Sequence, residues 1–221
     1  MTVVLSTSEE NYLKAVLHLS EDKLAVSTNE IAKLLNTKAS SATDMVQKLS
    51  DKGLIYYRKY KGSQLTSKGE KLALSVLRKH RLWEVFLVDH LGFKWDEIHE
   101  LAEQLEHIKS EKLVERLDTF LEHPQFDPHG DPIPDAEGNY VKKEEVCLDG
   151  SAEGTNGRIV SLNDSNSDFL QYMDTQDLQI GTKVSIEKIH GYDGSMNILV
   201  NGNKTITISQ RVAKNININE A

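Results

Sequence analysis

The stretch STNEIAKLLNTKASSATDMVQKLSDKG, residues 27–53, decides the fold of the N-terminal part of the chain. Ser27 stands three residues before Glu30, which is the spacing of a capping box that opens a helix. After a short break, a second helix is predicted to end at Gly53, a residue suited to the left-handed position that follows a helix. Two short helices joined by a tight turn predict a helix-turn-helix.

The flanking residues extend this motif. A first helix is predicted from Leu5 to Ser20, and LIYYRKYKGSQLTS, residues 54–67, alternates like a β-hairpin with a turn near Lys61 and Gly62. A helix-turn-helix with such a wing places one helix in the DNA major groove and the hairpin along the backbone. The exposed polar positions expected to contact bases and phosphates are Lys38, Ser40, Ser41, Thr43, Asp44, Gln47, Lys48, Arg58, Lys59 and Lys61. The alternative interpretation is a solvated helix face beside an edge hairpin.

The charges are unevenly distributed along the 221 residues. The net charge of −8 would argue against a nucleic-acid partner if it were uniform. Up to residue 82, however, the sequence contains 14 Lys and Arg against 8 Asp and Glu, and the remainder contains 12 against 26. A basic N-terminal third on an acidic remainder predicts that this third alone meets a polyanion, here double-stranded DNA.

A candidate divalent-metal site lies in WDEIHELAEQLEHI, residues 95–108, where a helix is predicted over 96–108. His99, Glu103, Glu106 and His107 share one face of that helix at a period of 3.6 residues. The preceding long helix, predicted to begin at a second capping box of Ser67 and Glu70, adds His80 and Glu84 one turn apart. Imidazoles and carboxylates from two helices form a donor set for a first-row metal ion. An acidic, solvated helix face is the alternative for any single member.

The C-terminal half has a different pattern. All four prolines fall between Pro124 and Pro134, and a polar, Gly-containing stretch follows, which predicts a linker. From residue 157 onward, short alternating segments with turns at Asp193-Gly194 and Asn201-Gly202 predict a small barrel of about five strands. The predicted domains are a winged helix-turn-helix (1–75), a helical domain (76–135), a linker (136–156) and a β-barrel (157–221).

Several classes of protein are disfavoured. Cys147 is the single cysteine, which excludes an intrachain disulfide and a thiolate-rich zinc site. The sequence contains no apolar run long enough for a membrane span and no leader-like N-terminus, so a cytoplasmic protein without a membrane partner is predicted. Glu103 stands where the zinc-protease pattern H-E-x-x-H needs its second histidine, and no nucleophile elbow or P-loop is present. We therefore expect no enzyme, with a metallohydrolase as the weaker alternative.

The chain resembles the diphtheria toxin repressor family of metal-dependent transcriptional regulators, and in particular its manganese-sensing branch. The resemblance covers nearly the whole length and rests on the segments TSEENYLKAV, VQKLSDKGLI, LTSKGEKLA, RKHRLWEVFL, ELAEQLEH and HGDPIP. It implies an α+β multidomain fold with an N-terminal winged helix-turn-helix, a helical dimerisation domain that forms a homodimer, and a C-terminal SH3-like (FeoA-like) β-barrel. It also implies a repressor of metal-uptake genes that binds a palindromic operator.

The resemblance further implies two metal sites. A regulatory site would use Asn11, Glu103, Glu106 and His107, and a second site would use His80, Glu84, His99 and Asp168, joined by His129 and, as a further candidate, Asp127. Asn11 and Lys14 both stand where carboxylates occur in other members, and Lys14 in particular argues for two separated sites instead of a paired one.

Manganese is the expected ion. Iron sensors of the family carry sulfur at the position of Glu103, whereas a hard carboxylate suits Mn²⁺. Fe²⁺ is the alternative, and Zn²⁺, Co²⁺ or Ni²⁺ would bind at least as tightly in vitro. The rival hypothesis within the same fold is a winged-helix regulator that needs no metal.

Overall fold

The computed structural model describes residues 4–20 and 23–220 of the chain. It divides into two compact units. The first contains residues 1–80, 104–111 and 134–140, and the second contains residues 81–103, 112–133 and 141–221.

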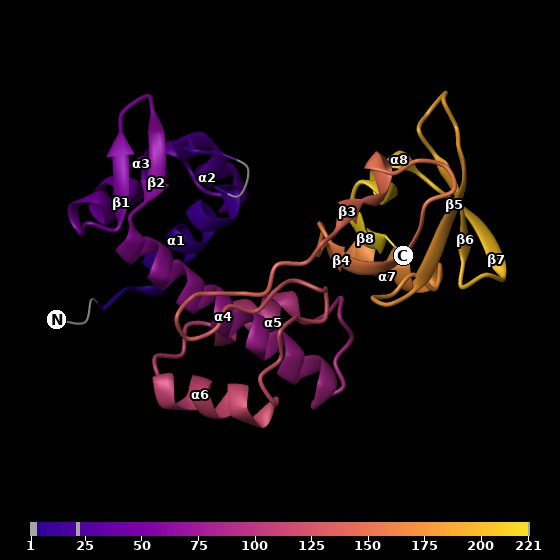
Figure 1. Ribbon diagram of the computed structural model, residues 1–221. Coiled ribbons are helices and arrows are strands. Elements are labelled where there is room, and N and C mark those ends of the chain that lie inside the picture. Colours follow the sequence, from indigo (N-terminus) through magenta and orange to yellow (C-terminus); the bar gives the residue numbers. More distant parts are fainter. Residues whose placement is uncertain (1–3, 21–22, 221) are drawn as a thin grey trace. The chain divides into compact units, whose positions relative to one another are not determined.

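The first unit contains the winged helix-turn-helix (Figure 1). Its elements are α1 (Thr7–Leu19), α2 (Thr28–Leu34), α3 (Ala39–Asp51), β1 (Ile55–Arg58) and β2 (Gly62–Leu65). Ser27 and Glu30 form the predicted capping box before α2, and Gly53 adopts a φ of +70° after α3. β1 and β2 pair antiparallel with Ile55 opposite Leu65. The α+β fold class and the helix-turn-helix with its wing are therefore confirmed.

A continuous apolar core holds these elements together. The side chains of Leu13, Ile31, Val46, Leu49 and Leu54 are fully buried in one cluster drawn from α1, α2, α3 and the start of the wing. Burying a leucine or isoleucine side chain stabilises a fold by about 1.5–3 kcal/mol. The helices α1 and α3 therefore share one core.

Glu9 is a buried carboxylate between α1 and α3. Its side chain is 2% exposed, and its Oε1 receives Lys52 Nζ at 2.6 Å and lies 3.1 Å from Lys48 Nζ. Its Oε2 accepts the backbone N–H of Ser6, which completes a capping box at the start of α1. Burial raises the pKa of Glu9, but the hydrogen bonds from Lys52, Ser6 and Lys48 outweigh it and lower the pKa to about 2.

This shift predicts a pH-dependent contribution of Glu9 to stability. The folded-state pKa lies below the ordinary 4.5, so the ionised form stabilises the fold at neutral pH and loses this effect as pH falls from 4.5 toward 2. Glu9→Gln is expected to lower the free energy of unfolding at pH 7 by roughly 2 kcal/mol, discounted because both lysines reach solvent. Urea unfolding between pH 2 and pH 7 measures the difference, which should shrink in acid. The exposed Glu115→Gln is the control, and a pH-independent difference would contradict this role of Glu9.

The long helix α4 (Ser67–Asp89) begins as predicted, but its cap differs. Thr66 Oγ1 accepts the backbone N–H of Gly69 at 3.0 Å and donates to the Gly53 carbonyl at 2.9 Å. The expected capping box of Ser67 and Glu70 is therefore wrong. Thr66 prevails because one hydroxyl satisfies both the helix start and the end of the preceding helical segment.

The helix predicted over 96–108 is shorter in the structure. α5 covers only His99–Leu105, and α6 covers Glu111–Phe120 directly after Ser110. Glu106 and His107 follow α5 in a turn, where their side chains bond to residues of α1 and α4. These tertiary contacts override the helical period that the sequence carries past residue 105.

The second unit contains a six-stranded antiparallel sheet in the order β3-β8-β4-β5-β6-β7 (Figure 1). Its elements are β3 (Val146–Cys147), the 3-10 helix η1 (Leu148–Gly150), β4 (Asn156–Leu162), α7 (Ser167–Thr175), β5 (Lys183–Ile189), β6 (Met196–Val200), β7 (Lys204–Ile208), α8 (Gln210–Ala213) and β8 (Ile216–Glu220). Four strands and the turn at Asn201-Gly202, with φ of 49° and 74°, agree with the sequence prediction. β3 lies inside the segment expected to be a linker, and β8 and α7 were not anticipated.

None of the described helices combines the length and the hydropathy that crossing a bilayer requires.

Candidate functional site

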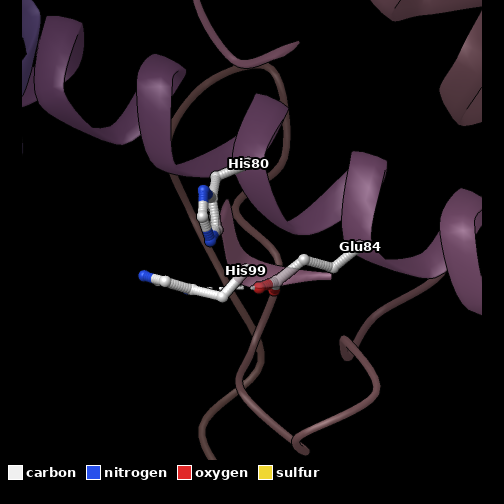
Figure 2. Close-up of side chains that lie close together, drawn as sticks. All are labelled: His80, Glu84 and His99. Atoms are coloured by element: carbon white, nitrogen blue, oxygen red, sulfur yellow. Dashed lines mark ion pairs between the residues drawn. The ribbon is translucent and has the colours of Figure 1, made fainter. Parts of the chain in front are cut away.

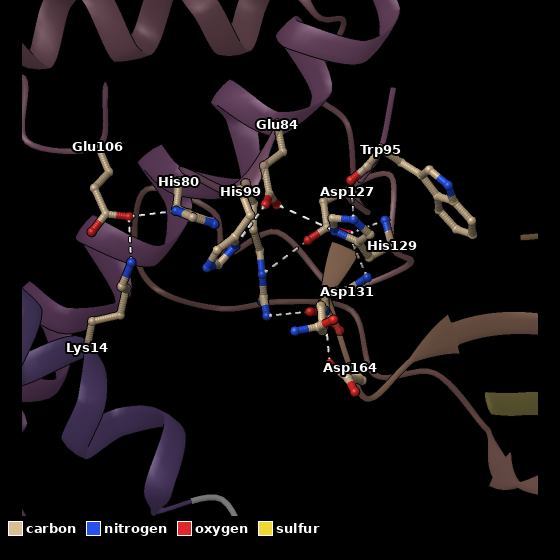
Figure 3. Close-up of polar contacts among 12 residues, drawn as sticks. Lys14, His80, Glu84, Trp95, His99, Glu106, Asp127, His129, Asp131 and Asp164 are labelled. Atoms are coloured by element: carbon tan, nitrogen blue, oxygen red, sulfur yellow. Dashed lines mark hydrogen bonds and ion pairs between the residues drawn. The ribbon is translucent and has the colours of Figure 1, made fainter. Parts of the chain in front are cut away.

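Glu106 is the buried centre of a polar cluster in the first unit (Figure 3). Its side chain is fully buried, and its Oε2 receives Lys14 Nζ at 2.7 Å and lies 2.7 Å from His80 Nδ1. Lys14 comes from α1 and His80 from α4. The turn after α5 is thus held against the first helix of the helix-turn-helix by an ion pair that is almost removed from solvent.

Glu106 Oε1 and Asn11 Oδ1 are both buried, and neither has a hydrogen-bond partner among the residues that the structure describes. The imidazole of His107 lies beside Glu106, with Nε2 3.6 Å from Glu106 Oε1, and its Nδ1 is 2.6 Å from Glu10 Oε2. A buried acceptor without a donor costs about 1–3 kcal/mol, so native proteins rarely retain one without a reason.

These atoms fit a hard divalent cation. We call Asn11, Glu103, Glu106 and His107 the α1 site. It offers carboxylate and amide oxygens and an imidazole nitrogen, which are the ligand types that Mn²⁺ and Fe²⁺ accept. The ammonium group of Lys14 engages one oxygen of Glu106 and leaves the other without a hydrogen bond.

A second group of donors projects from the middle of α4 (Figure 2). His80 and Glu84 stand one turn apart on this helix, and Glu84 Oε1 lies 3.6 Å from His99 Nδ1. His80 and Glu84 are buried, whereas His99 is exposed. The assignment of these residues to a metal site stays a prediction.

A third group brings the proline-rich segment to Glu84 (Figure 3). Glu84, Asp127 and His129 are all buried, and their ligand atoms lie within 4.8 Å of one another. We call these three residues the loop site. Burial raises the pKa of Asp127, and the neighbouring carboxylates of Glu84 and Asp131 raise it further. Two acids and an imidazole buried together suit a divalent cation, which supplies the missing positive charge.

Hydrogen bonds fix the backbone around Asp127. Its Oδ1 accepts the backbone N–H groups of His129 at 2.8 Å and Asp131 at 2.9 Å. Arg81 approaches from α4, with Nε 3.5 Å from Asp127 Oδ2 and NH2 3.2 Å from Asp131 Oδ2. Arg81 also donates to the Pro132 carbonyl. These hydrogen bonds and ion pairs therefore hold the backbone of the loop site without a contribution from a metal ion.

The C-terminal sheet also contacts this loop. The backbone N–H of Leu162, at the end of β4, donates to the His129 carbonyl at 3.2 Å. Lys143 Nζ donates to the carbonyls of Gly130 at 2.6 Å and Val160 at 2.7 Å. Gly130 has a φ of +87°, and a Cβ added there would lie 2.0 Å from the Val160 carbonyl oxygen. Only glycine permits this close approach of loop and strand.

The acid expected from the barrel is placed differently. Asp168 is exposed in the first turn of α7 and belongs to none of the three donor groups among the described residues. Asp164 is half-buried two residues after Leu162, whose N–H bonds to the His129 carbonyl, and Figure 3 includes it among the polar residues of this region. Among the described residues, Asp164 likewise belongs to none of the three donor groups.

The predicted DNA-contacting side chains lie on the surface of the first unit. All are exposed except Thr43, which is half-buried and donates its hydroxyl to the Ala39 carbonyl at 2.8 Å. Gln47 donates to Asp51 at 3.1 Å, and Lys48 pairs with Glu9. Tyr60, not anticipated as a contact, is 94% exposed at the tip of the wing, where the ammonium group of Lys59 lies 5.3 Å from its ring centre.

Sequence reasoning did not foresee some functional contacts. Lys14 was interpreted as a replaced carboxylate and not as the partner of Glu106, and the contacts of Glu10 with His107 and Lys109 were not anticipated. Glu10 is adjacent to Asn11 on α1, and Lys14 lies about one helical turn after it. The helical period could therefore have indicated that Lys14 and Asn11 share one face of α1. No sequence signal identifies Asp164.

Three family models match successive segments of the chain. Residues 4–63 match the N-terminal DNA binding domain of the iron dependent repressor family, residues 66–135 match its metal binding and dimerisation domain, and residues 146–220 match the FeoA domain. The chain is 26% identical to the iron-dependent repressor IdeR of Mycobacterium tuberculosis, over 97% of each chain. It is 27% identical to the diphtheria toxin repressor of Corynebacterium diphtheriae, over 98% of each chain. It is also 40% identical to an HTH-type transcriptional regulator of Methanocaldococcus jannaschii, over 53% of this chain and 95% of that one.

Solved structures are similar over nearly the whole chain. A manganese-dependent transcriptional repressor in complex with manganese superposes with a TM-score of 0.90 at 30% identity, covering 96% of this chain and 100% of that one. The manganese regulator SloR gives 0.78 at 37% identity, covering 96% and 98%. ScaR with bound Zn²⁺ gives 0.81 at 34% identity, covering 96% and 99%.

Proposed function

The chain belongs to the iron-dependent repressor family, whose members are metal-dependent, DNA-binding transcriptional repressors, and from this premise we propose that it represses metal-uptake genes in response to Mn²⁺. The proposal assigns the α1 site, Asn11, Glu103, Glu106 and His107, to the regulatory ion. It assigns a second ion to the loop site, Glu84, Asp127 and His129, with Asp164 as a further donor and His80 and His99 beside Glu84. Its place of action would be the cytoplasm.

One observation carries the assignment of the regulatory site. Asn11 Oδ1 on α1 and Glu106 Oε1 after α5 are both buried and lack a hydrogen-bond partner within the same compact unit. A bound dication would supply positive charge that neutralises the carboxylates and accepts these lone pairs. Asn11 and Glu106 would then hold α1 in one position, in addition to the ion pair between Lys14 and Glu106.

The helix α1 is the element that connects this site to DNA. It shares its core with α3, and Glu9 on α1 pairs with Lys48 and Lys52 of α3. Fixing α1 therefore restricts the position of α3, the helix proposed to enter the major groove. In a homodimer, two such helices would read half-sites of a palindromic operator roughly one DNA turn, about 34 Å, apart.

The donor set supports manganese over iron. Neither proposed site contains sulfur, and the carboxylate of Glu103 is a hard donor suited to Mn²⁺. The similar solved structures include a manganese-dependent repressor with manganese and ScaR with Zn²⁺ or Cd²⁺. Fe²⁺ remains the alternative ion in the cell, and Zn²⁺ is expected to bind in vitro because affinity follows the Irving-Williams order.

DNA binding measured with and without Mn²⁺ tests the proposed function. The probe is a palindromic duplex selected from random DNA by the full-length protein with Mn²⁺ present. Fluorescence anisotropy is expected to give an affinity about 5- to 150-fold higher with Mn²⁺ than with a chelator, the usual range of allosteric coupling. Equal affinities would contradict metal-dependent regulation by this chain.

A wing variant separates DNA contact from metal response. Arg58→Gln with Lys59→Gln removes two exposed cations of the hairpin. We expect weaker binding in both conditions and a salt dependence shallower by about one unit per lost phosphate contact. The ratio between the Mn²⁺ and chelator affinities should be unchanged, because neither residue touches the α1 site.

A further inference from the structure

Trp95 contacts the C-terminal part of the second unit. It belongs to the segment that connects α4 to α5 along the chain, and its ring packs against the apolar core of the C-terminal sheet. Its indole Nε1–H donates to Asp174 Oδ2 on α7 at 3.0 Å. The next residue, Asp96, accepts from Gln171 Nε2 of the same helix at 2.9 Å. α7 therefore determines where the 95–96 segment lies.

The same tryptophan contacts a residue of the loop site (Figure 3). His129 Nε2 is 3.0 Å from the Trp95 carbonyl oxygen, and the two rings are stacked with centres 6.0 Å apart and planes at 21°. A carbonyl oxygen only accepts, so Nε2 must carry the proton in this bond. The lone pair of the neutral ring then resides on Nδ1, which lies 4.0 Å from Glu84 Oε2. Trp95 thus selects both the ring orientation and the tautomer that leaves Nδ1 available to a cation.

We propose that Trp95 is a positioning residue through which α7 of the C-terminal domain sets the metal affinity of the loop site. This inference rests on the proposed loop site and gives the C-terminal domain a role in metal sensing. A histidine ligand commonly donates its other ring N–H to a fixed acceptor, and losing that acceptor costs about 10- to 100-fold in metal affinity. The chain from Asp174 through Trp95 to His129 places such an acceptor under the control of α7.

Other contacts of the loop act on different atoms. Leu162 and Lys143 bond to the backbone carbonyls of His129 and Gly130, so they position the main chain. Trp95 bonds to the imidazole itself. A variant that disturbs Trp95 should therefore change the donor strength of His129 without displacing the loop.

Two variants of the full-length protein test the proposal. Trp95→Phe retains an aromatic ring and loses the indole N–H, and Asp174→Ala removes its acceptor. Calorimetric titration with MnCl₂ is expected to show one of two ions bound about 10-fold more weakly in both variants, with the other ion unaffected. Asp177→Ala is the matched control, because this exposed acid just beyond α7 pairs with Lys204 and not with Trp95. Unchanged titrations of Trp95→Phe and Asp174→Ala would overturn the inference.

A spectroscopic readout separates positioning from a general loss of stability. The indole N–H resonance that is missing in Trp95→Phe identifies Trp95 in nitrogen-15 spectra. In the wild-type protein, ZnCl₂ should shift this resonance, and MnCl₂ should broaden it, at the equivalent that fills the loop site. In Asp174→Ala the resonance should move before any metal is added. A resonance that does not respond to either ion would count against the proposal.

A ligand variant distinguishes this inference from the proposed function. His129→Ala removes the imidazole itself and is expected to abolish the binding of one ion. If His129→Ala binds two ions with wild-type affinity, the loop site is wrong. If it loses one ion while Trp95→Phe and Asp174→Ala titrate like the wild type, the loop site stands and the positioning role of Trp95 is rejected.

Discussion

Glu106→Gln is expected to abolish the response of DNA binding to Mn²⁺. The wild-type affinity should rise about 5- to 150-fold with the ion, and that of the variant should stay at the chelator value. The reason is that Glu106 is fully buried, and its Oε1 has no hydrogen-bond partner among the described residues and lies 3.6 Å from His107 Nε2. The glutamine oxygen can still accept from Lys14, so circular dichroism should report an intact fold. Anisotropy with the selected duplex measures the response, and calorimetry should show one ion fewer.

Glu100→Gln is the matched control for this experiment. Glu100 is an exposed acid of α5, on the same short helix that precedes Glu106. It belongs to none of the donor groups among the residues described. Both the metal stoichiometry and the DNA response of this variant should equal those of the wild type. A Glu106→Gln protein that retains its Mn²⁺ response would remove the α1 site from the account.

Gly130→Ala is expected to detach the metal-binding loop from β4. The new Cβ would lie 2.0 Å from the Val160 carbonyl oxygen at a φ of +87°, so loop and strand cannot keep their contact. The loss of stability should be roughly 2–4 kcal/mol, which combines backbone strain with a broken contact. Because Asp127 and His129 lie within the three residues before this position, the loop site should lose its ion while the α1 site keeps its own. Urea unfolding and MnCl₂ calorimetry measure the two effects.

Gly154→Ala is the control that separates the effect of backbone strain at positive φ from the effect of a steric clash between the new Cβ and a neighbouring strand. Gly154 has the same φ of +87°, and a Cβ there would meet no atom within 4 Å. This variant should lose about 1 kcal/mol through backbone strain alone and bind two ions. If Gly130→Ala behaves like Gly154→Ala in both measurements, the close packing of the loop on β4 does not matter for metal binding.

Local signals predicted the helix-turn-helix well. The Ser27–Glu30 capping box, Gly53 and the Asn201-Gly202 turn each express a short-range preference of the backbone, and each appears in the structure where the sequence placed it. The error at Ser67 has the same origin, because Ser67 and Thr66 are both competent caps. The choice between them depends on the Gly53 carbonyl, 13 residues earlier.

Long-range partners were harder to foresee. Glu106 and His107 were assigned to a helix face because the 3.6-residue pattern continues past Leu105, yet their bonds to Lys14 and Glu10 draw them into a turn. The strand β8 was missed because its role depends on pairing with β3 and β4. Such pairing leaves little trace in the alternation of a single short segment.

The predicted metal donors show the same contrast between local signals and long-range contacts. His80 and Glu84 were predictable because one helix turn separates them. The approach of Asp127 and His129 to Glu84 depends on the fold of the proline-rich loop, and the family resemblance alone suggested it. The roles of Lys14 and Trp95 follow only from contacts with residues 92 and 79 positions away, respectively.

Thermodynamic reciprocity tests the central claim most directly. If a metal ion at the α1 site and DNA on α3 are coupled, the operator must raise the affinity for Mn²⁺ by the same factor by which Mn²⁺ raises the affinity for the operator. Calorimetric MnCl₂ titration of the full-length protein, alone and saturated with the selected duplex, measures the first factor, and anisotropy measures the second. We expect the two factors to be equal and to lie in the range of about 5- to 150-fold. Identical Mn²⁺ affinities with and without DNA would contradict the account.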